Sequence, residues 1–204
     1  MYNQQRPVII AICGKSATGK DTLANWLLSM LKASNIPANM IVSDTTRLPR
    51  PFEKNKIDYN FLTEEEFYNK IDNEDYLEYS SFNGWFYGTD RSIILKDSIN
   101  IGVFNLNGMI DLMQYQCDFE IICVYLKCSL IQRLVRSYER ENCFKLEYLR
   151  RAYADYCDFK KADNILKHYL SIFIFNTKNT PIITMADHII WLLKMKNFLP
   201  SRIS

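Results

Sequence analysis

The fold of this 204-residue chain is decided near its start, by the stretch Val8-Ile9-Ile10-Ala11-Ile12-Cys13-Gly14-Lys15-Ser16-Ala17-Thr18-Gly19-Lys20. Its first six residues are apolar and rich in β-branched side chains, which predicts a short buried strand. After Lys20, apolar residues recur at helical spacing between Leu23 and Leu31. The pattern G-x-x-x-x-G-K therefore stands between a strand and a helix, the context in which it predicts a phosphate-binding loop.

The chemistry of this loop explains the prediction. Gly14 and Gly19 let the backbone curl so that its N–H groups point inward, and Lys20 adds a full positive charge to that of the helix N-terminus. We expect these residues to bind nucleotide phosphates: Gly14, Lys15, Ser16, Ala17, Thr18, Gly19, Lys20, Asp21 and Thr22. Where the pattern usually has a Mg²⁺-binding hydroxyl, this chain has Asp21, so Asp21 is the first candidate ligand for Mg²⁺ and Thr22 the alternative.

The rest of the chain repeats the alternation of strand and helix. A second strand is predicted at 38–42, and further strands are predicted at 99–104, 119–126 and 171–175, each of these three followed by helical periodicity. Such alternation predicts an α/β fold with a parallel sheet flanked by helices. Residues 43–91 break the rhythm with many aromatic residues and with turn signals at Asn83-Gly84 and Gly88, which predicts an inserted β-rich unit.

Composition excludes several classes of protein. A net charge of +2 and a pI near 8.1 do not indicate nucleic-acid binding. The apolar runs are too short to span a membrane, and the first residues do not resemble a signal peptide, so we expect a cytoplasmic protein, monomeric or homodimeric. Six cysteines without a C-x-x-C pair, Cys143 among them, indicate reduced thiols. Two histidines, His168 and His188, exclude a histidine-rich metal site.

Four further motifs follow in order, and together they carry a resemblance to a known family. They are Ser43-Asp44-Thr45-Thr46-Arg47-Leu48-Pro49-Arg50-Pro51, Asp58-Tyr59-Asn60-Phe61, Tyr76-Leu77-Glu78-Tyr79 and Trp85-Phe86-Tyr87-Gly88-Thr89. This series closely resembles the guanylate kinase family, from about Val8 to Thr177. The resemblance implies an ATP:GMP phosphotransferase of P-loop kinase fold. It implies a core over 1–42, 92–128 and 158–204, a nucleotide-monophosphate-binding unit over 43–91 and a helical lid over 129–157.

The chemistry of these motif residues suits a monophosphate acceptor. Arg47 and Arg50 offer forked donors for the acceptor phosphate, with Arg47 also counted as catalytic because it would align that phosphate with the donor. Tyr59 and Tyr87 can add neutral O–H donors, as the tyrosines of the family do.

The base would be bound by a second group of residues. Glu78 accepts hydrogen bonds and so matches the N–H donors of guanine, while the Ser43 and Thr89 hydroxyls can reach O6 or N2. The acidic pair of the family falls on Val103 and Asn105, so both carboxylates are missing. We expect the Asn105 amide oxygen to accept from the base more weakly than an acid would, which leaves base selectivity open.

The predicted lid carries the remaining candidates. Arg136, Arg140 and Arg151 have spacings similar to the arginines with which the family grips the ATP phosphates, so we expect them to be catalytic together with Lys20 and Arg47. The glycine-rich lid turn of the family is absent, and Arg133 and Arg150 are alternatives. Asn176 falls where the family has a residue near the adenine.

Three functions compete on this sequence. The leading one is an ATP- and Mg²⁺-dependent kinase of a nucleoside monophosphate, GMP or dGMP. The second is a kinase of another small phosphate ester or of several deoxynucleoside monophosphates, motivated by Asn105. The third is a catalytically silent guanylate-kinase-like binding module, which the intact Gly19, Lys20, Arg136 and Arg140 oppose.

Overall fold

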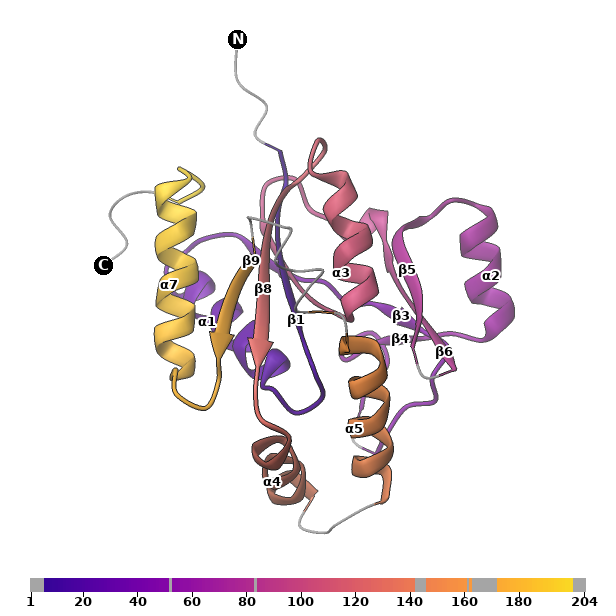
Figure 1. Ribbon diagram of the computed structural model, residues 1–204. Helices are drawn as coiled ribbons and strands as arrows, with labels where there is room; N and C mark the ends of the chain where they lie inside the picture. Colours follow the sequence, from indigo (N-terminus) through magenta and orange to yellow (C-terminus); the bar gives the residue numbers. More distant parts are fainter. Residues whose placement is uncertain are drawn as a thin grey trace.

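The computed structural model describes residues 6–51, 53–82, 84–141, 146–160, 162 and 172–199 (Figure 1). Its centre is a parallel sheet with the strand order β2-β7-β1-β8-β9. The strands are β1 (Val8–Gly14), β2 (Ala38–Met40), β7 (Ile99–Phe104), β8 (Glu120–Lys127) and β9 (Ile172–Asn176). The predicted α/β class with a parallel sheet is therefore confirmed.

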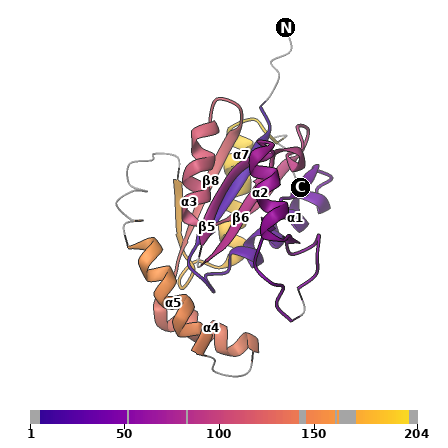
Figure 2. The same ribbon diagram turned by 90° about the vertical axis from the view of Figure 1, so that its right-hand side faces the viewer.

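Helices cover both faces of this sheet (Figures 1 and 2). On one face, α1 (Lys20–Ala33) and α7 (Ile182–Met195) bury Leu27 and Ile189 against Ile10 of β1. On the other face, α3 (Leu106–Leu112) buries Met109 against Ile9. Because neighbouring residues of β1 enter different apolar clusters, the strand has no solvent face, which explains its unbroken apolar run.

A second, four-stranded sheet with the order β4-β3-β6-β5 lies beside the first, and all of its strands fall within residues 43–91. They are β3 (Asp44–Thr45), β4 (Asn60–Phe61), β5 (Tyr76–Phe82) and β6 (Trp85–Asp90), accompanied by α2 (Glu64–Asp72). Phe67 of α2 stacks on Tyr76 and Phe86 at ring-centroid distances of 4.6 and 5.5 Å. The hairpin between β5 and β6 includes Gly84 at a φ of 82°, a conformation that favours glycine. The predicted β-rich insert is thus confirmed, with the aromatic residues forming its core.

A lobe of two helices, α4 (Leu130–Glu141) and α5 (Leu146–Phe159), lies beyond the carboxyl ends of the central strands (Figure 2). Two short 3₁₀ helices complete the described elements, η1 (Arg91–Ile93) and η2 (Met113–Tyr115). Within the described ranges, none of the helices combines the length and the apolar character that crossing a bilayer requires.

The predicted strand boundaries were accurate to within two residues. The strand at 99–104 is confirmed, while the strands predicted at 119–126 and 171–175 lie one residue further on, at Glu120–Lys127 and Ile172–Asn176. The strand predicted at 38–42 ends at Met40, although the Ile41 N–H still donates to the Ile101 carbonyl at 2.8 Å.

The cysteine prediction is confirmed for the described thiols. Cys13, Cys117, Cys123, Cys128 and Cys157 are free. Cys13 and Cys123 are buried in the central sheet, whereas Cys117 and Cys157 are exposed. Cys143, His168 and Asn83 of the predicted turn lie outside the described residues.

One polar side chain is fully buried between the central strands. The Asn100 amide nitrogen donates to the carbonyls of Val8, Leu95 and Ser98 at 3.1, 2.9 and 3.1 Å. Its oxygen accepts from the Leu95 N–H and from the Asn39 amide. The side chain thus joins β1, β2 and the segment that leads into β7.

Candidate active site

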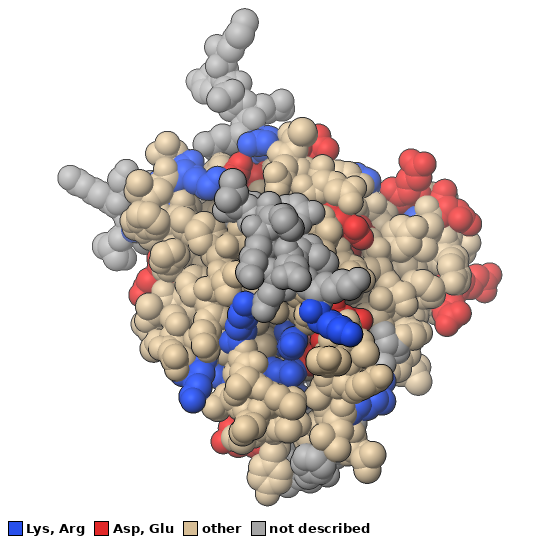
Figure 3. All heavy atoms as spheres, in the orientation of Figure 1, with Lys and Arg blue, Asp and Glu red and all other residues tan. Residues whose placement is uncertain are grey.

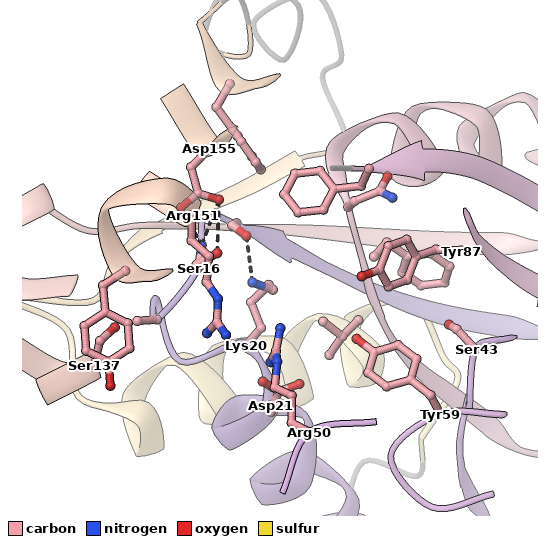
Figure 4. Close-up of a pocket in the computed structure, with 18 of the residues that line it drawn as sticks. Ser16, Lys20, Asp21, Ser43, Arg50, Tyr59, Tyr87, Ser137, Arg151 and Asp155 are labelled. Carbon is pink, nitrogen blue, oxygen red and sulfur yellow. Dashed lines mark hydrogen bonds between the residues drawn. The ribbon is translucent and has the colours of Figure 1, made fainter. Parts of the chain in front are cut away.

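A pocket lies where the phosphate-binding loop meets the small sheet and the lobe of α4 and α5. Figure 3 shows Lys and Arg side chains gathered around a hollow above this lobe. Thirteen of the predicted site residues line the pocket: Gly14, Ser16, Ala17, Lys20, Asp21, Ser43, Arg50, Tyr59, Glu78, Tyr87, Asn105, Arg140 and Arg151. In Figure 4, Ser43, Tyr59 and Tyr87 lie opposite Arg151 and Asp155, with Lys20, Asp21 and Arg50 between them.

The phosphate-binding loop depends on its two glycines. A Cβ at Gly14 would lie 2.6 Å from the Leu126 carbonyl oxygen, so no side chain fits there. Gly19 is the N-cap residue that precedes α1, and its φ of 98° is a conformation that favours glycine. Lys20 Nζ donates to the carbonyls of Gly14 and Lys15 at 2.7 and 3.2 Å, so its charge is held against the loop itself. Thr18 is buried and donates from its hydroxyl to the Lys15 carbonyl at 2.8 Å.

The two candidate Mg²⁺ ligands are placed differently. Asp21 lines the pocket from the first turn of α1, directly after Lys20. The exposed Thr22 does not line it. A carboxylate is a hard oxygen ligand, so the position of Asp21 beside the phosphate-binding loop fits a divalent cation.

The two arginines of the first motif have different surroundings. Arg50 lines the pocket, and its pKa is lowered by partial burial and by the positive charges of Arg151 and Arg47. Arg50 also pairs with Glu53 at 3.6 Å, and the positive charges of Arg50 and Arg151 that act on each other favour an anion in the pocket. Arg47 does not line the pocket: it is 5% exposed and forms two 3.0 Å hydrogen bonds with the Glu53 carboxylate. Burial alone would lower the pKa of Arg47, but Glu53 together with Tyr87 and Tyr59 outweighs burial, and the pKa is raised.

The two tyrosines stand together on the small-sheet side of the pocket. The rings of Tyr59 and Tyr87 meet edge to face at 6.0 Å. Burial, followed by the negative charge of Asp21, raises the pKa of Tyr59. Its hydroxyl therefore stays protonated and can donate to an anion.

The far end of the pocket holds Glu78, which is 7% exposed. Burial raises the pKa of Glu78 to about 7, against a hydrogen bond from Thr89 that lowers it, and the charge of Asp111 raises it further. Thr89 was expected to contact the base, but it is fully buried outside the pocket lining and donates to Glu78 Oε1 at 2.6 Å. The Thr89 hydroxyl therefore orients the Glu78 carboxylate.

Asn105 lines the same end of the pocket, and its amide has two partners within the protein. Its oxygen accepts from the Gly108 N–H at 2.8 Å and so caps α3, while its nitrogen donates to the Ser80 hydroxyl oxygen at 2.7 Å. One acceptor position of this oxygen is therefore taken by the N-terminus of α3, which the sequence did not predict.

The predicted lid arginines separate into two groups. Arg140 and Arg151 line the pocket. Arg136 does not, because its guanidinium donates to the Thr177 hydroxyl and carbonyl at 3.0 and 2.9 Å and to the Thr18 carbonyl at 3.2 Å. Arg136 thus ties α4 to the phosphate-binding loop. Arg150, an alternative in the sequence, lies over the Trp85 ring at 5.5 Å.

Asp155 is the main residue that the sequence analysis missed. This 2% exposed acid lines the pocket from α5, accepts from the Ser16 N–H at 3.0 Å and forms a buried ion pair with Arg133. The signal was present, because Asp155 follows Arg151 by four residues and helical spacing places both on one face. Other unpredicted lining residues are Phe82, Val103, Phe104, Ser137, Tyr148 and Phe159.

Asn176 and Lys15 line a second cavity instead of the main pocket. The Asn176 side-chain oxygen accepts from the Lys178 N–H at 3.1 Å. The Lys15 ammonium lies 5.8 Å from the centre of the Phe159 ring. The Lys15 backbone carbonyl contacts Lys20 in the phosphate-binding loop, whereas the Asn176 side chain does not line the main pocket.

The fold and this pocket define an α/β protein of the P-loop kinase class, with its phosphate-binding loop at the carboxyl end of β1. Comparison with known proteins agrees. A family model described as guanylate kinase matches residues 4–154, and the chain belongs to the guanylate kinase family.

Individual relatives match over shorter stretches. The chain is 38% identical over 94 residues to a guanylate kinase of Synechococcus elongatus, an alignment that covers 46% of this chain and 49% of the relative. It is 40% identical over 96 residues to one of Clostridium perfringens, which covers 47% and 43%. The chain thus spans less than half the length of these relatives. The crystal structure of guanylate kinase from Anaplasma phagocytophilum has a TM-score of 0.65 at 22% identity, covers 94% of this chain and 87% of that one, and shows a shared fold.

Proposed function

We propose that this protein transfers the γ-phosphoryl group of ATP to a nucleoside monophosphate, with GMP or dGMP as the acceptor. The observation that carries the proposal is one continuous pocket with Lys20 in the phosphate-binding loop, Arg50 and the tyrosines beside it, and Glu78 at the far end. The proposal includes the division into a core (1–42, 92–128 and 158–204), a monophosphate-binding unit (43–91) and a lid (129–157).

The donor end of the pocket would bind ATP through the loop backbone and Lys20. Arg140 and Arg151 reach this pocket from α4 and α5, and their charges would stabilise negative charge that spreads over the transferring phosphoryl group. Asp21 would hold Mg²⁺ here. The ion would supply positive charge that neutralises the phosphates of the donor.

The acceptor end would bind the monophosphate through Arg50, Tyr59 and Tyr87. The charge of Arg151 on α5 acts on Arg50, which favours a phosphate placed between the lobe and the small sheet. Glu78 would accept from the base N–H, with its carboxylate oriented by Thr89. Holding both phosphates in line is the main contribution that the protein makes to this reaction.

The test measures ADP release from ATP and Mg²⁺ with a panel of GMP, dGMP, other nucleoside monophosphates and small phosphate esters. Lys20→Ala should abolish transfer and leave GMP binding intact, because Lys20 serves the donor. Lys32→Ala, an exposed lysine in the last turn of the same helix, is the matched control.

Each alternative predicts a different result. Preferred turnover of a non-nucleotide ester, or similar turnover of several deoxynucleoside monophosphates, would favour the second function. Binding of GMP, with no ADP released from ATP in the presence of any acceptor, would favour a silent binding module and refute the proposal.

A further inference from the structure

The amide of Asn105 can take only one orientation in this pocket. Its oxygen accepts from the Gly108 N–H at 2.8 Å, and a backbone N–H can only donate. Its nitrogen must therefore be the atom that lies 2.7 Å from the Ser80 hydroxyl oxygen. Rotating the amide by 180° would set two donors against each other at the start of α3.

The Asn105 oxygen also has a crowded second side. A Cβ on Gly108 would lie 2.4 Å from Glu78 Oε2 and 3.3 Å from Asn105 Oδ1, so both oxygens stand over the same glycine. The Asn105 oxygen is therefore bordered by the helix N–H and by the Glu78 carboxylate. The amide nitrogen has two N–H groups, of which Ser80 takes one. An N–H donor is thus what this side chain can offer to a base.

We infer that Asn105 makes the pocket select 6-oxopurine monophosphates as a class, IMP as well as GMP, because it supplies a donor where a 2-amino group needs an acceptor. The inference rests on the proposed function. Guanine and hypoxanthine share the N1–H that Glu78 can accept, and they differ in the 2-amino group of guanine. A donor facing that group gains no hydrogen bond, so guanine has no advantage from Asn105.

The experiment compares kcat/KM for GMP, IMP and XMP in the wild type and in Asn105→Asp. The wild type should use IMP within about tenfold of GMP. Asn105→Asp supplies an acceptor for the 2-amino group and should raise the GMP:IMP ratio about tenfold or more, the effect of one charged hydrogen bond. XMP has a carbonyl in place of the 2-amino group. In Asn105→Asp, kcat/KM for XMP should fall relative to that for IMP, because the new carboxylate repels this carbonyl.

The matched control is Asn107→Asp, which adds the same charge to an exposed position of α3 outside the pocket lining and should leave the GMP:IMP ratio unchanged. Aspartate caps a helix as well as asparagine, so Asn105→Asp keeps the bond to Gly108. Calorimetric binding of GMP and IMP to the wild type adds a measurement that needs no variant, with dissociation constants expected within about tenfold of each other.

The outcomes separate this inference from the proposed function. The role of Asn105 is overturned if the ratio of kcat/KM for GMP to that for IMP changes by less than about threefold in Asn105→Asp. It is also overturned if Asn107→Asp changes this ratio as much as Asn105→Asp does. A wild type that binds GMP more than about a hundredfold tighter than IMP overturns it as well. The proposed function fails separately, when the wild type phosphorylates none of the three nucleotides.

Discussion

Replacing Glu78 by glutamine should stabilise the folded protein and at the same time lower its catalytic activity. The pKa of Glu78 rises from its usual 4.5 to about 7 on folding, mainly because the carboxylate is buried. One pKa unit corresponds to about 1.4 kcal/mol, so the wild type should lose about 3 kcal/mol of stability through this group between pH 4.5 and pH 7. The folded state binds the proton more tightly, so stability falls as pH rises through this window.

Glutamine has no charge to bury and keeps an oxygen that can accept from Thr89. The free energy of unfolding of Glu78→Gln should therefore equal that of the wild type below pH 4.5 and exceed it by about 3 kcal/mol above pH 7. Urea unfolding at pH 4.5, 5.5, 6.5 and 7.5 measures the difference. Exposed Glu65 provides a control, because Glu65→Gln removes a charge without changing a buried site.

The same variant should lose about tenfold to a hundredfold in kcat/KM for GMP at pH 8, because a charged acceptor becomes a neutral one. In the wild type, kcat/KM should fall as pH drops below about 7, since protonated Glu78 loses its charge and one acceptor position. Glu78→Gln should lack this pH dependence. A stability difference that is the same at every pH would refute the reasoning, because it would show that the burial of charge is not its source.

Three further predictions follow from the pocket. Asp21→Asn should raise the Mg²⁺ midpoint for ATP binding severalfold in calorimetric titrations, while Thr22→Val leaves it unchanged; the opposite pattern would assign the ion to Thr22. Arg50→Ala should raise the KM of the acceptor about tenfold or more and spare that of ATP, and an unchanged acceptor KM in steady-state kinetics would contradict its role. Asp155→Asn leaves Arg133 buried without its counter-charge and should cost about 3 kcal/mol in urea unfolding, whereas a loss below about 1 kcal/mol would show that the pair is unimportant.

The sequence predicted most of the fold because its strongest signals are local. The apolar run at Val8, the two glycines of the loop and the apolar spacing of α1 depend only on near neighbours in the chain, and the structure confirms the strand and the helix. The strand ends were less certain, since the last pairs of a ladder depend on the partner strand. Met40, where β2 ends, is an example.

The sequence predicted many of the residues that line the site, but not the contacts that their side chains make. Glu78 lies in the pocket as expected, because the motif spacing fixes its position on β5. Arg47 was expected beside Arg50, but whether a guanidinium reaches a ligand or a protein carboxylate depends on Glu53 and on burial, which the motif does not specify.

The orientation of an amide was equally out of reach from the sequence. The partners of Asn105 come from β5 and from the first turn of α3, and only the folded chain brings them together. The motif identified the residue, and the structure identified which of its atoms faces which neighbour.

The buried Asn100 side chain also determines which alignment of the central sheet is allowed. β7 is apolar apart from Asn100, so sliding it by two residues along β2 would still bury similar apolar side chains. Such a slip would separate the Asn100 amide oxygen from the Asn39 amide nitrogen that donates to it, and a buried polar atom that loses its partner costs about 1 to 3 kcal/mol. One polar residue in an apolar sheet thus discriminates against misaligned, misfolded forms of this protein that the hydrophobic effect alone would tolerate.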